Sequence, residues 1–408
     1  RPPSFVQPPA SVGRPLVQSP SMHLRKLSLM NYRNYQRCLV DLEPGATIFH
    51  GDNGQGKTNL LEAVYLLATT KSFRTTADRE LLSWRAIQER QLFARVEGWV
   101  GRQAGDLHVE MLLKGETNGA AGGDDAPAMT KTIKLNGLPA RAPQIVGELN
   151  AVIFSPEDLD LLHGAPAGRR RYLDITRSQI DRAYLRALQR YQRVLTQRNH
   201  LLRQARDRRQ ELSSLVVWND ELIQLGSAIV RHRVALIADL NRAMADLYRR
   251  LTRTERTLEL RYRASSQPDL GELSDEEARA AFRSRLSQYQ QRELDQGVSL
   301  VGPHRDDFVF LVDGVDMGAF GSRGEQRMIA VALKLAEAVV IRALMSDSPV
   351  LLLDDILSEL DPTRRQFVQE QIQGDFQTLI TVADLSTCSD LLRAGAQQFR
   401  VERGALSQ

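Results

Sequence analysis

The chain has 408 residues, of which 42% are hydrophobic and 25% charged, and its formal net charge is +4. This length and apolar content predict a globular protein of two or three domains with ample core, and the lack of a run of about eighteen apolar residues excludes a membrane span. The two cysteines, Cys38 and Cys388, are far apart and in no metal-ligand spacing. They favour a reducing, cytoplasmic compartment without a disulfide framework.

Residues 1–21 are rich in proline and lack apolar periodicity. Such a segment cannot bury enough apolar surface to order itself, so we expect a disordered extension ahead of a folded domain that starts near Met22. The segment also lacks the long apolar stretch that a secretory signal requires.

A phosphate-binding loop is predicted near the start of the folded part. Residues 46–50 form a short β-prone run, and residues 59–67 have the apolar pattern of a buried helix. The residues that fit G-x-x-x-x-G-K-[ST] between them are Gly51, Asp52, Asn53, Gly54, Gln55, Gly56, Lys57 and Thr58. In this context backbone N–H groups approach phosphate oxygens. We expect Lys57 to reach the β- and γ-phosphates of ATP and the Thr58 hydroxyl to bind Mg²⁺.

A β-rich stretch follows the loop and its helix. Apolar residues alternate over residues 107–113, as expected of a half-buried strand, and a second strand is predicted at residues 133–135. Between them, residues 116–128 are rich in Gly, Ala and Asp and predict a mobile hairpin tip. Asn136-Gly137 predicts a further turn.

The composition changes after residue 166. Between residues 169 and 209, thirteen arginines stand against three aspartates. A second long helical pattern over residues 222–251 has coiled-coil-like spacing, and residues 278–294 predict one more helix. We therefore expect a helical arm at residues 167–295, inserted into the nucleotide-binding domain. The apolar stripe of its first helix consists of Tyr184, Leu188, Tyr191 and Leu195.

A basic stripe runs parallel to this apolar one and consists of Arg182, Arg186, Arg190 and Arg193. A basic helical face is often only solvated surface, and that interpretation stays open. In the alternative, these arginines neutralise DNA phosphates, which gives salt-dependent binding with little sequence preference. The scarcity of glutamate between them favours DNA, because a solvated face normally mixes charges of both signs.

A second motif with nucleotide chemistry lies near the C-terminal end. Residues 350–353 are an apolar run that ends in Asp354 and Asp355. Such a run is typical of a parallel strand buried on both faces, and carboxylates at its end lie where ligands bind in open α/β sheets. We expect Asp354 to hold Mg²⁺ and Asp355 to orient or deprotonate the attacking water. The alternative is a strand followed by an acidic helix cap.

Ser322 opens a helical pattern that runs to residue 344. A small polar residue and a glycine at a helix N-terminus can bind an anion, although the same residues also suit a simple N-cap. The position of this helix, leading into the strand at residues 350–354, favours the nucleotide interpretation. Residues 356–362 then place small and acidic side chains where two such sites can meet across a dimer.

These three motifs in this order resemble the Walker A, signature and Walker B segments of the ABC-type ATPases. A long helical stretch between the first two motifs resembles the arrangement in the branch of this family that includes the SMC proteins. From Met22 onward the details resemble the RecF family of bacterial recombinational repair ATPases. The segments that carry this resemblance read LMNYRNY (29–35), KSFRT (71–75), FSPEDL (154–159), RRRYLD (169–174), QRN (197–199), GPHRDD (302–307) and DDILSELD (354–361).

The resemblance implies an α/β fold, in which an ABC-type (P-loop) ATPase head with mixed β-sheets carries the inserted α-helical arm, or lobe II. The head would comprise residues 22–166 and 296–408. The resemblance further implies an ATP-dependent homodimer, in which each nucleotide lies between the Walker A loop of one subunit and Ser322 of the other. It also implies binding to double-stranded DNA near single-strand gaps, where the family works with RecR and RecO to help load RecA.

Two departures from the ABC pattern bear on activity. Asp355 stands where ABC ATPases usually have Glu, and its shorter side chain suggests slow hydrolysis, which suits a switch better than a motor. We therefore expect a weak ATPase activity, and the resemblance implies that it depends on DNA. Residues 382–384 read Val-Ala-Asp, so no switch histidine is assigned there. Gln144 is a candidate for the glutamine loop, and the roles of His304 and Arg305 stay open.

Two other functions are compatible with the motifs. One is an SMC-like scaffold ATPase for a nuclease, which the short arm and the lack of a C-x-x-C hook disfavour. The other is a transporter ATPase subunit, which the inserted arginine-rich arm disfavours.

Overall fold

The computed structural model of the chain describes residues 22–102, 105–116, 128–208, 215–266 and 274–408. The expected disordered extension at residues 1–21 and most of the expected hairpin tip at residues 116–128 lie outside these ranges. Within the described ranges, no helix is long and apolar enough to cross a membrane.

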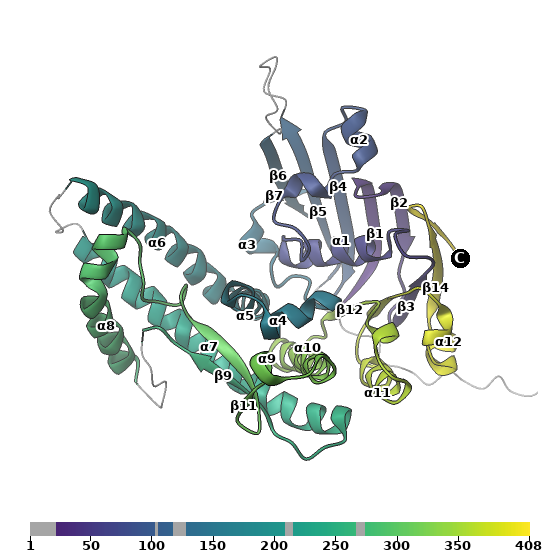
Figure 1. Ribbon diagram of the computed structural model, residues 1–408. Coiled ribbons are helices and arrows are strands. Elements are labelled where there is room, and N and C mark those ends of the chain that lie inside the picture. Colours follow the sequence, from purple (N-terminus) through teal and green to yellow (C-terminus); the bar gives the residue numbers. More distant parts are fainter. Residues whose placement is uncertain (1–21, 103–104, 117–127, 209–214, 267–273) are drawn as a thin grey trace, which may run out of the picture.

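An antiparallel sheet forms one layer of the head (Figure 1), in the strand order β2-β1-β4-β5-β6-β7. Its strands are β1 (His23–Tyr32), β2 (Tyr35–Asp41), β4 (Phe93–Gly101), β5 (Leu107–Glu116), β6 (Ala128–Leu135) and β7 (Leu138–Ala140). Alternate residues from Leu107 to Leu113 are buried, which confirms the predicted half-buried strand. Asn136 and Gly137, with φ of 50° and 80°, form the predicted turn between β6 and β7.

A second sheet, parallel except at one edge, carries the nucleotide motifs in the order β15-β14-β3-β13-β12-β8. Its strands are β3 (Ala46–His50), β8 (Ala151–Phe154), β12 (Val350–Asp354), β13 (Thr378–Val382), β14 (Gln397–Glu402) and β15 (Ala405–Ser407). Every residue of β12 is buried, which confirms the strand predicted at residues 350–354. β3 and β12 run parallel and are separated only by β13. The loop after β3 and the carboxylates Asp354 and Asp355 at the end of β12 therefore lie together, at the carboxyl ends of the strands.

Helix α1 (Lys57–Thr69) packs against both sheets, and all but two of its residues are buried. One hydrophobic core contains α1, the antiparallel sheet and one face of the parallel sheet. The other face of the parallel sheet packs in a second core with helices of the C-terminal part and of the arm. The short elements around the sheets are η1 (Asp78–Leu81), α2 (Trp84–Gln88), α3 (Ala142–Ile145), η2 (Pro156–Leu159), α4 (Asp160–His163), η4 (Ile356–Glu359), α11 (Pro362–Ile372), η5 (Leu385–Thr387) and α12 (Asp390–Gly395).

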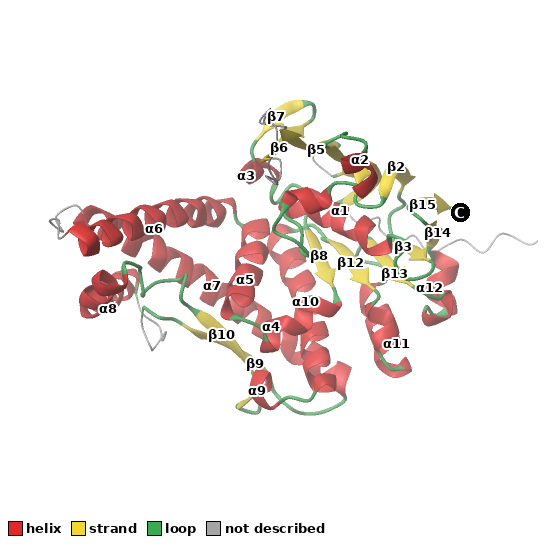
Figure 2. Ribbon diagram, turned by 45° about the horizontal axis from the view of Figure 1, so that its top comes forward, coloured by secondary structure: helices red, strands yellow, loops and turns green. Residues whose placement is uncertain are grey.

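The arm projects to one side of the sheets, as Figure 1 and Figure 2 both show. Its helices are α5 (Pro166–Ile180), α6 (Arg182–Arg208), α7 (Leu215–Thr252) and α8 (Asp275–Gln296), so the long helices expected from the apolar periodicity are confirmed. A buried cluster joins α6, α7 and α8 through Tyr184, Tyr191, Leu222, Ile229 and Phe282.

A small sheet and helix α10 (Arg323–Met345) adjoin the base of the arm. The sheet has the order β11-β10-β9, from β9 (Leu258–Arg263), β10 (Asp307–Val312) and β11 (Val315–Asp316), and α9 (Met317–Phe320) follows it. β9 pairs with β10 across the predicted boundary at residue 295, and α10 packs on α7 and α5. The domain bounds remain predictions, but a division at residue 295 would separate two paired strands.

Candidate nucleotide-binding site

The phosphate-binding loop, residues 51–56, connects β3 to α1 through a backbone that only glycine adopts easily. Gly51 and Gly56 have φ of 144° and 113°. A Cβ at Gly51 would lie 2.5 Å from the Val401 carbonyl oxygen, and one at Gly56 would lie 2.4 Å from Asn34 Nδ2. These two glycines are therefore required by the close approach of neighbouring segments as well as by the turn itself.

Lys57 is the first residue of α1, and its side chain crosses the loop. The ammonium group donates hydrogen bonds to the carbonyl oxygens of Gly51 (2.6 Å) and Asp52 (2.9 Å). Burial lowers the pKa of this amine, while the nearby carboxylates of Asp355 and Asp354 act in the opposite direction. A cation held beside a helix N-terminus favours a polyanion such as a triphosphate.

The two predicted motifs meet directly. The Thr58 hydroxyl donates a 2.7 Å hydrogen bond to Asp354 Oδ1, which joins residues 296 positions apart. The Thr381 hydroxyl donates a second bond of 2.8 Å to the same oxygen. Burial raises the pKa of Asp354, and these two hydroxyl donors oppose that rise. The carboxylate is thus buried, oriented and adjacent to the loop.

The residues at this point suit a magnesium ion that is shared with phosphate oxygens. Asp354 Oδ2 accepts no hydrogen bond from the described residues, and the Thr58 hydroxyl is the second oxygen ligand at hand. Among the same residues, no group of three acidic, His or Cys side chains could hold a metal by itself. Mg²⁺ is usually bound by one or two protein oxygens together with substrate phosphates, so this donor set fits it.

Asp355 has a strained backbone that sets its side chain apart from that of Asp354. Its φ of 53° lies in the left-handed region, and its N–H donates to Thr381 Oγ1 at 3.0 Å. The Ser358 hydroxyl donates to Asp355 Oδ1 at 2.6 Å. A non-glycine residue in this conformation persists where the surroundings fix it, which is common at functional sites.

Ser322 lies at the N-terminus of α10, outside the cluster formed by Lys57, Thr58, Asp354 and Asp355. Its side chain forms a reciprocal cap with Glu325, and Glu325 also pairs with Arg256 at 2.8 Å. Ser322 is exposed. One turn along α10, Arg327 pairs with Glu359 of η4 at 3.1 Å. The structure therefore connects α10 to the segment that follows Asp355, while Ser322 itself faces outward.

The segment after β8 is a part of the site that the sequence reasoning missed. β8 pairs with β12 so that Phe154 is level with Leu353, and the next residues reach the same edge as Asp354. The charge of Glu157 contributes to raising the pKa of Asp354. Gln144, the candidate for a glutamine loop, instead caps α3 by accepting a bond from the Arg141 N–H at 2.7 Å.

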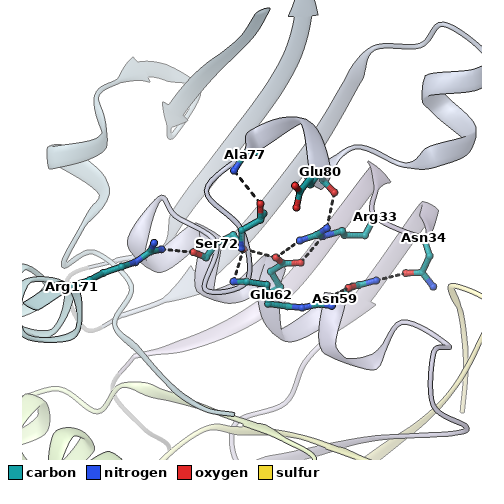
Figure 3. A network of polar contacts seen from close by, with 10 residues as sticks. Arg33, Asn34, Asn59, Glu62, Ser72, Ala77, Glu80 and Arg171 are labelled. Atoms are coloured by element: carbon teal, nitrogen blue, oxygen red, sulfur yellow. Dashed lines mark hydrogen bonds and ion pairs between the residues drawn. The ribbon is translucent and has the colours of Figure 1, made fainter. Parts of the chain in front are cut away.

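A polar network behind the loop, shown in Figure 3, was also missed. Arg33 donates two hydrogen bonds to the buried carboxylate of Glu62 on α1, at 2.8 and 2.6 Å. The Ser72 hydroxyl donates to the same carboxylate. The segments LMNYRNY and KSFRT therefore meet at Glu62, and they fix α1 directly behind the phosphate-binding loop. Neither the apolar periodicity nor the motif spacing of the sequence indicated this role.

His304 and Arg305, whose roles were left open, lie against the arm, where His304 contacts Tyr191 of α6. Both hydrogen-bond the Ser299 carbonyl, His304 through Nε2. Because a carbonyl only accepts, Nε2 carries the proton and Nδ1 accepts from the Tyr191 hydroxyl at 2.7 Å. Burial lowers the pKa of His304 to about 4. The imidazole is therefore a neutral, structural group.

The four arginines of the predicted basic stripe are exposed on α6. Arg182 forms an ion pair with Glu148, and Arg190 forms one with Glu221 of α7. Neither Arg186 nor Arg193 has an acidic partner among the described residues. The negative charge that the α6 sequence lacks is thus partly supplied by other elements.

A groove of about 1840 Å³ opens beside the phosphate-binding loop, on the antiparallel sheet and η1. Its lining includes Arg37, Arg79 and Arg403, which are exposed and have no carboxylate partner among the described residues. The head thus presents a second cationic surface that the sequence reasoning did not locate.

The fold and this site together define a P-loop ATPase head of the ABC type. The sequence model of the RecF/RecN/SMC N-terminal domain family matches residues 23–401. The chain belongs to the RecF family of DNA replication and repair proteins.

Relatives and solved structures agree with this assignment. The chain is 42% identical to the DNA replication and repair protein RecF of Chloroflexus aurantiacus, over 94% of this chain and 99% of the relative. It is 37% identical to that of Halalkalibacterium halodurans, over 95% and 100%. A structure of the recombination mediator protein RecF with ATP, from the RecFOR pathway, superposes with a TM-score of 0.84 at 30% identity and covers 95% of this chain and 98% of that one. The Smc head domain of Pyrococcus furiosus shares the fold, with a TM-score of 0.52.

Proposed function

We propose that this protein is an ATP-controlled switch of DNA replication and recombinational repair, which binds duplex DNA near single-strand gaps as an ATP-dependent dimer. The observation that carries the proposal is the 2.7 Å bond between Thr58 and Asp354. It supports a composite Walker A and Walker B site in a chain of the RecF family, and the relative solved with ATP supports the choice of nucleotide.

ATP would lie with its phosphates on the loop, where Lys57 exchanges its two carbonyl acceptors for phosphate oxygens. Thr58 and Asp354 would hold Mg²⁺, which when bound supplies positive charge against the β- and γ-phosphates. Asp355 would orient the attacking water and accept its proton. Its short side chain and its bond from Ser358 leave little freedom, which supports slow hydrolysis.

Ser322 supports a dimer because it is exposed and has no contact with the loop of its own chain. The N-terminus of α10 would approach the γ-phosphate held by a second copy. The pair between Arg327 and Glu359 then connects that helix to the segment after Asp355 in the same chain, so that each subunit senses the nucleotide in both sites.

DNA binding would use cations of the arm, of the head groove, or of both. By family membership we further propose a cytoplasmic protein that acts with RecR and RecO to help load RecA. The free thiols of Cys38 and Cys388 suit a reducing compartment.

Fluorescence anisotropy with labelled duplex DNA, with ATP, ADP or no nucleotide, tests the proposed function. We expect tight binding only with ATP. Equal affinity in all three conditions would remove the nucleotide from the mechanism and favour a scaffold role.

A further inference from the structure

A pocket of about 480 Å³ lies between the head and the arm, where α5 leads into α6. Three segments that the nucleotide chemistry does not use meet in its lining. They contribute Lys71 from KSFRT, Arg170 and Arg171 from RRRYLD, and His304 from GPHRDD. The volume is typical of a specific ligand site.

The cations of this pocket are not neutralised. Lys71, Arg170 and Arg171 form no ion pair within the described part of the chain. Arg170 donates to the Asp306 carbonyl at 2.8 Å and Arg171 to the Ser72 carbonyl at 2.7 Å (Figure 3), so both meet only neutral acceptors. Burial is the main cause that lowers the pKa of Lys71 and of Arg170, and a neighbouring arginine adds to it, while Asp174 in both cases opposes the change only in part.

The nearby acids are already committed. Asp174, which also lines the pocket, accepts two hydrogen bonds from Arg233, at 2.9 and 3.0 Å. Asp307 is bound by Arg169 at 2.6 and 2.9 Å. Both carboxylates act on the charge of Arg170, and Asp174 also acts on that of Lys71, but neither forms an ion pair with these cations.

Gln179 is an independent sign of a ligand. It lines the pocket, is 1% exposed, and its Oε1 accepts the Ala151 N–H at 2.9 Å. That bond fixes the amide orientation and leaves the buried Nε2 without an acceptor. A buried unsatisfied donor is unfavourable and calls for a bound partner. The pocket thus offers three cations, its wall contains one buried amide group without an acceptor, and its one carboxylate is occupied.

We propose that this pocket binds an acidic peptide segment of a protein partner, with a carboxylate at the cations and an adjacent apolar side chain against α6. The lining also includes Leu185, Leu188 and Leu195 of α6, which suit an apolar group. A carboxylate with an apolar neighbour matches a lining that places leucines beside cations, whereas a duplex phosphate has no apolar group to set against those leucines.

The test uses the full chain saturated with Mg-ADP, so that the phosphate-binding loop is occupied. The probe is a fluorescein-labelled peptide Gly-Asp-Leu-Asp-Phe with a free carboxyl terminus, and its neutral counterpart is Gly-Asn-Leu-Asn-Phe amide. Anisotropy should report binding of the acidic peptide only. Lack of binding up to about 1 mM, or equal binding of both peptides, overturns the proposal.

Gln179→Glu is the sharpest variant, because Glu keeps an acceptor for the Ala151 N–H and replaces the free donor with a carboxylate oxygen. The new carboxylate should raise Tm by pairing with the cations, and it should weaken peptide binding at least about tenfold. Lys71→Gln should weaken peptide binding similarly, whereas Lys71→Arg, which keeps the charge, should bind the peptide as the wild type does. Arg242→Gln, which removes an exposed charge already paired with Asp239 on α7, should leave peptide binding unchanged.

Labelled duplex and single-stranded DNA are measured on the same variants. If Gln179→Glu and Lys71→Gln lose DNA binding but keep the peptide, the pocket takes a DNA phosphate and the peptide proposal is wrong. If Gln179→Glu lowers Tm and leaves peptide affinity unchanged, the amide is only structural. Either result leaves the ATP-dependent switch itself unaffected.

Discussion

At the scale of single residues, a small number of side chains form the candidate nucleotide site, and hydrogen bonds hold most of them in place. Asp354 accepts from Thr58 and Thr381, and Asp355 accepts from Ser358. Asp354 is held by residues of two other elements, and Asp355 by the short helix that it caps, so the carboxylates need little rearrangement when a nucleotide binds. Lys57 is the exception, because its two loop acceptors must give way to phosphate oxygens.

Lys57→Arg should therefore weaken ATP binding by about tenfold or more while the fold stays intact. A planar guanidinium cannot replace a compact ammonium between the Gly51 and Asp52 carbonyls. Isothermal calorimetry with ATP measures the change in affinity, and circular dichroism checks the fold. Wild-type affinity in this variant would mean that the loop does not hold the triphosphate.

Asp355→Asn should bind ATP normally but hydrolyse it at least about tenfold more slowly. The amide preserves the shape but cannot accept a proton from water. Phosphate release under single-turnover conditions measures the rate, and Ser358→Ala serves as a milder comparison because it removes only the bond that orients Asp355. An unchanged rate would require another base, for which Glu157, whose charge acts on Asp354, is a candidate.

At the scale of elements, the helices of the arm are joined by buried charge as well as by apolar packing. Arg198 of α6 bonds Glu293 of α8 at 2.6 Å, Asn219 of α7 at 2.7 Å and Ser299 at 2.7 Å. Arg198 is 2% exposed and Glu293 is fully buried. A single side chain thus contacts two other helices and the segment that leads to His304.

Arg198→Met should destabilise the protein by about 3–5 kcal/mol, because it leaves the Glu293 carboxylate buried and unpaired. Urea denaturation followed by circular dichroism measures this change. The double variant Arg198→Met, Glu293→Met should recover most of the stability, since it removes both charges and keeps apolar bulk. A double variant no more stable than the single one would assign the destabilisation to packing instead.

At the scale of the whole molecule, two cationic surfaces are candidates for the DNA binding that we propose. The arm stripe has two arginines already paired with glutamates, Arg182 and Arg190. The head groove has three that are unpaired among the described residues, Arg37, Arg79 and Arg403. The two surfaces predict different results from charge removal.

Replacing Arg186 and Arg193 with Gln should lower the slope of log affinity against log salt by about 0.9 for each DNA phosphate that is no longer neutralised, if the arm holds the DNA. Replacing Arg182 and Arg190 should change it less, since those charges are already compensated. We expect the salt slope to fall more in the Arg186 and Arg193 variant than in the Arg182 and Arg190 variant. If only the Arg37, Arg79 and Arg403 triple variant lowers the slope, the head groove holds the DNA and the arm stripe is solvated surface.

Much of this architecture could be predicted because its signals are local. The loop from Gly51 to Thr58 is contiguous, and the run before Asp354 needs only its own composition to indicate a buried strand. The bond from Arg33 to Glu62, the role of Thr381 and the orphan amide of Gln179 could not be predicted. Each depends on contacts between distant segments, and neither periodicity nor spacing encodes which segments meet.

The same limit applies to charge. The α6 sequence has few acids between its arginines, yet Glu148 and Glu221 reach Arg182 and Arg190 from other elements. Charge patterning along one helix therefore overstates how much positive potential the folded surface presents.

Light scattering of the protein with ATP, ADP or no nucleotide tests the central claim most directly. The chain has a mass of 45.9 kDa. We predict that the particle mass in solution is twice this value with ATP, and equals it with ADP or without nucleotide. Ser322→Arg should bind ATP as a monomer and stay monomeric, because a bulky side chain at the α10 N-terminus occupies the space for the partner's γ-phosphate. A protein that remains monomeric with ATP, or a Ser322→Arg variant that dimerises like wild type, would contradict the account.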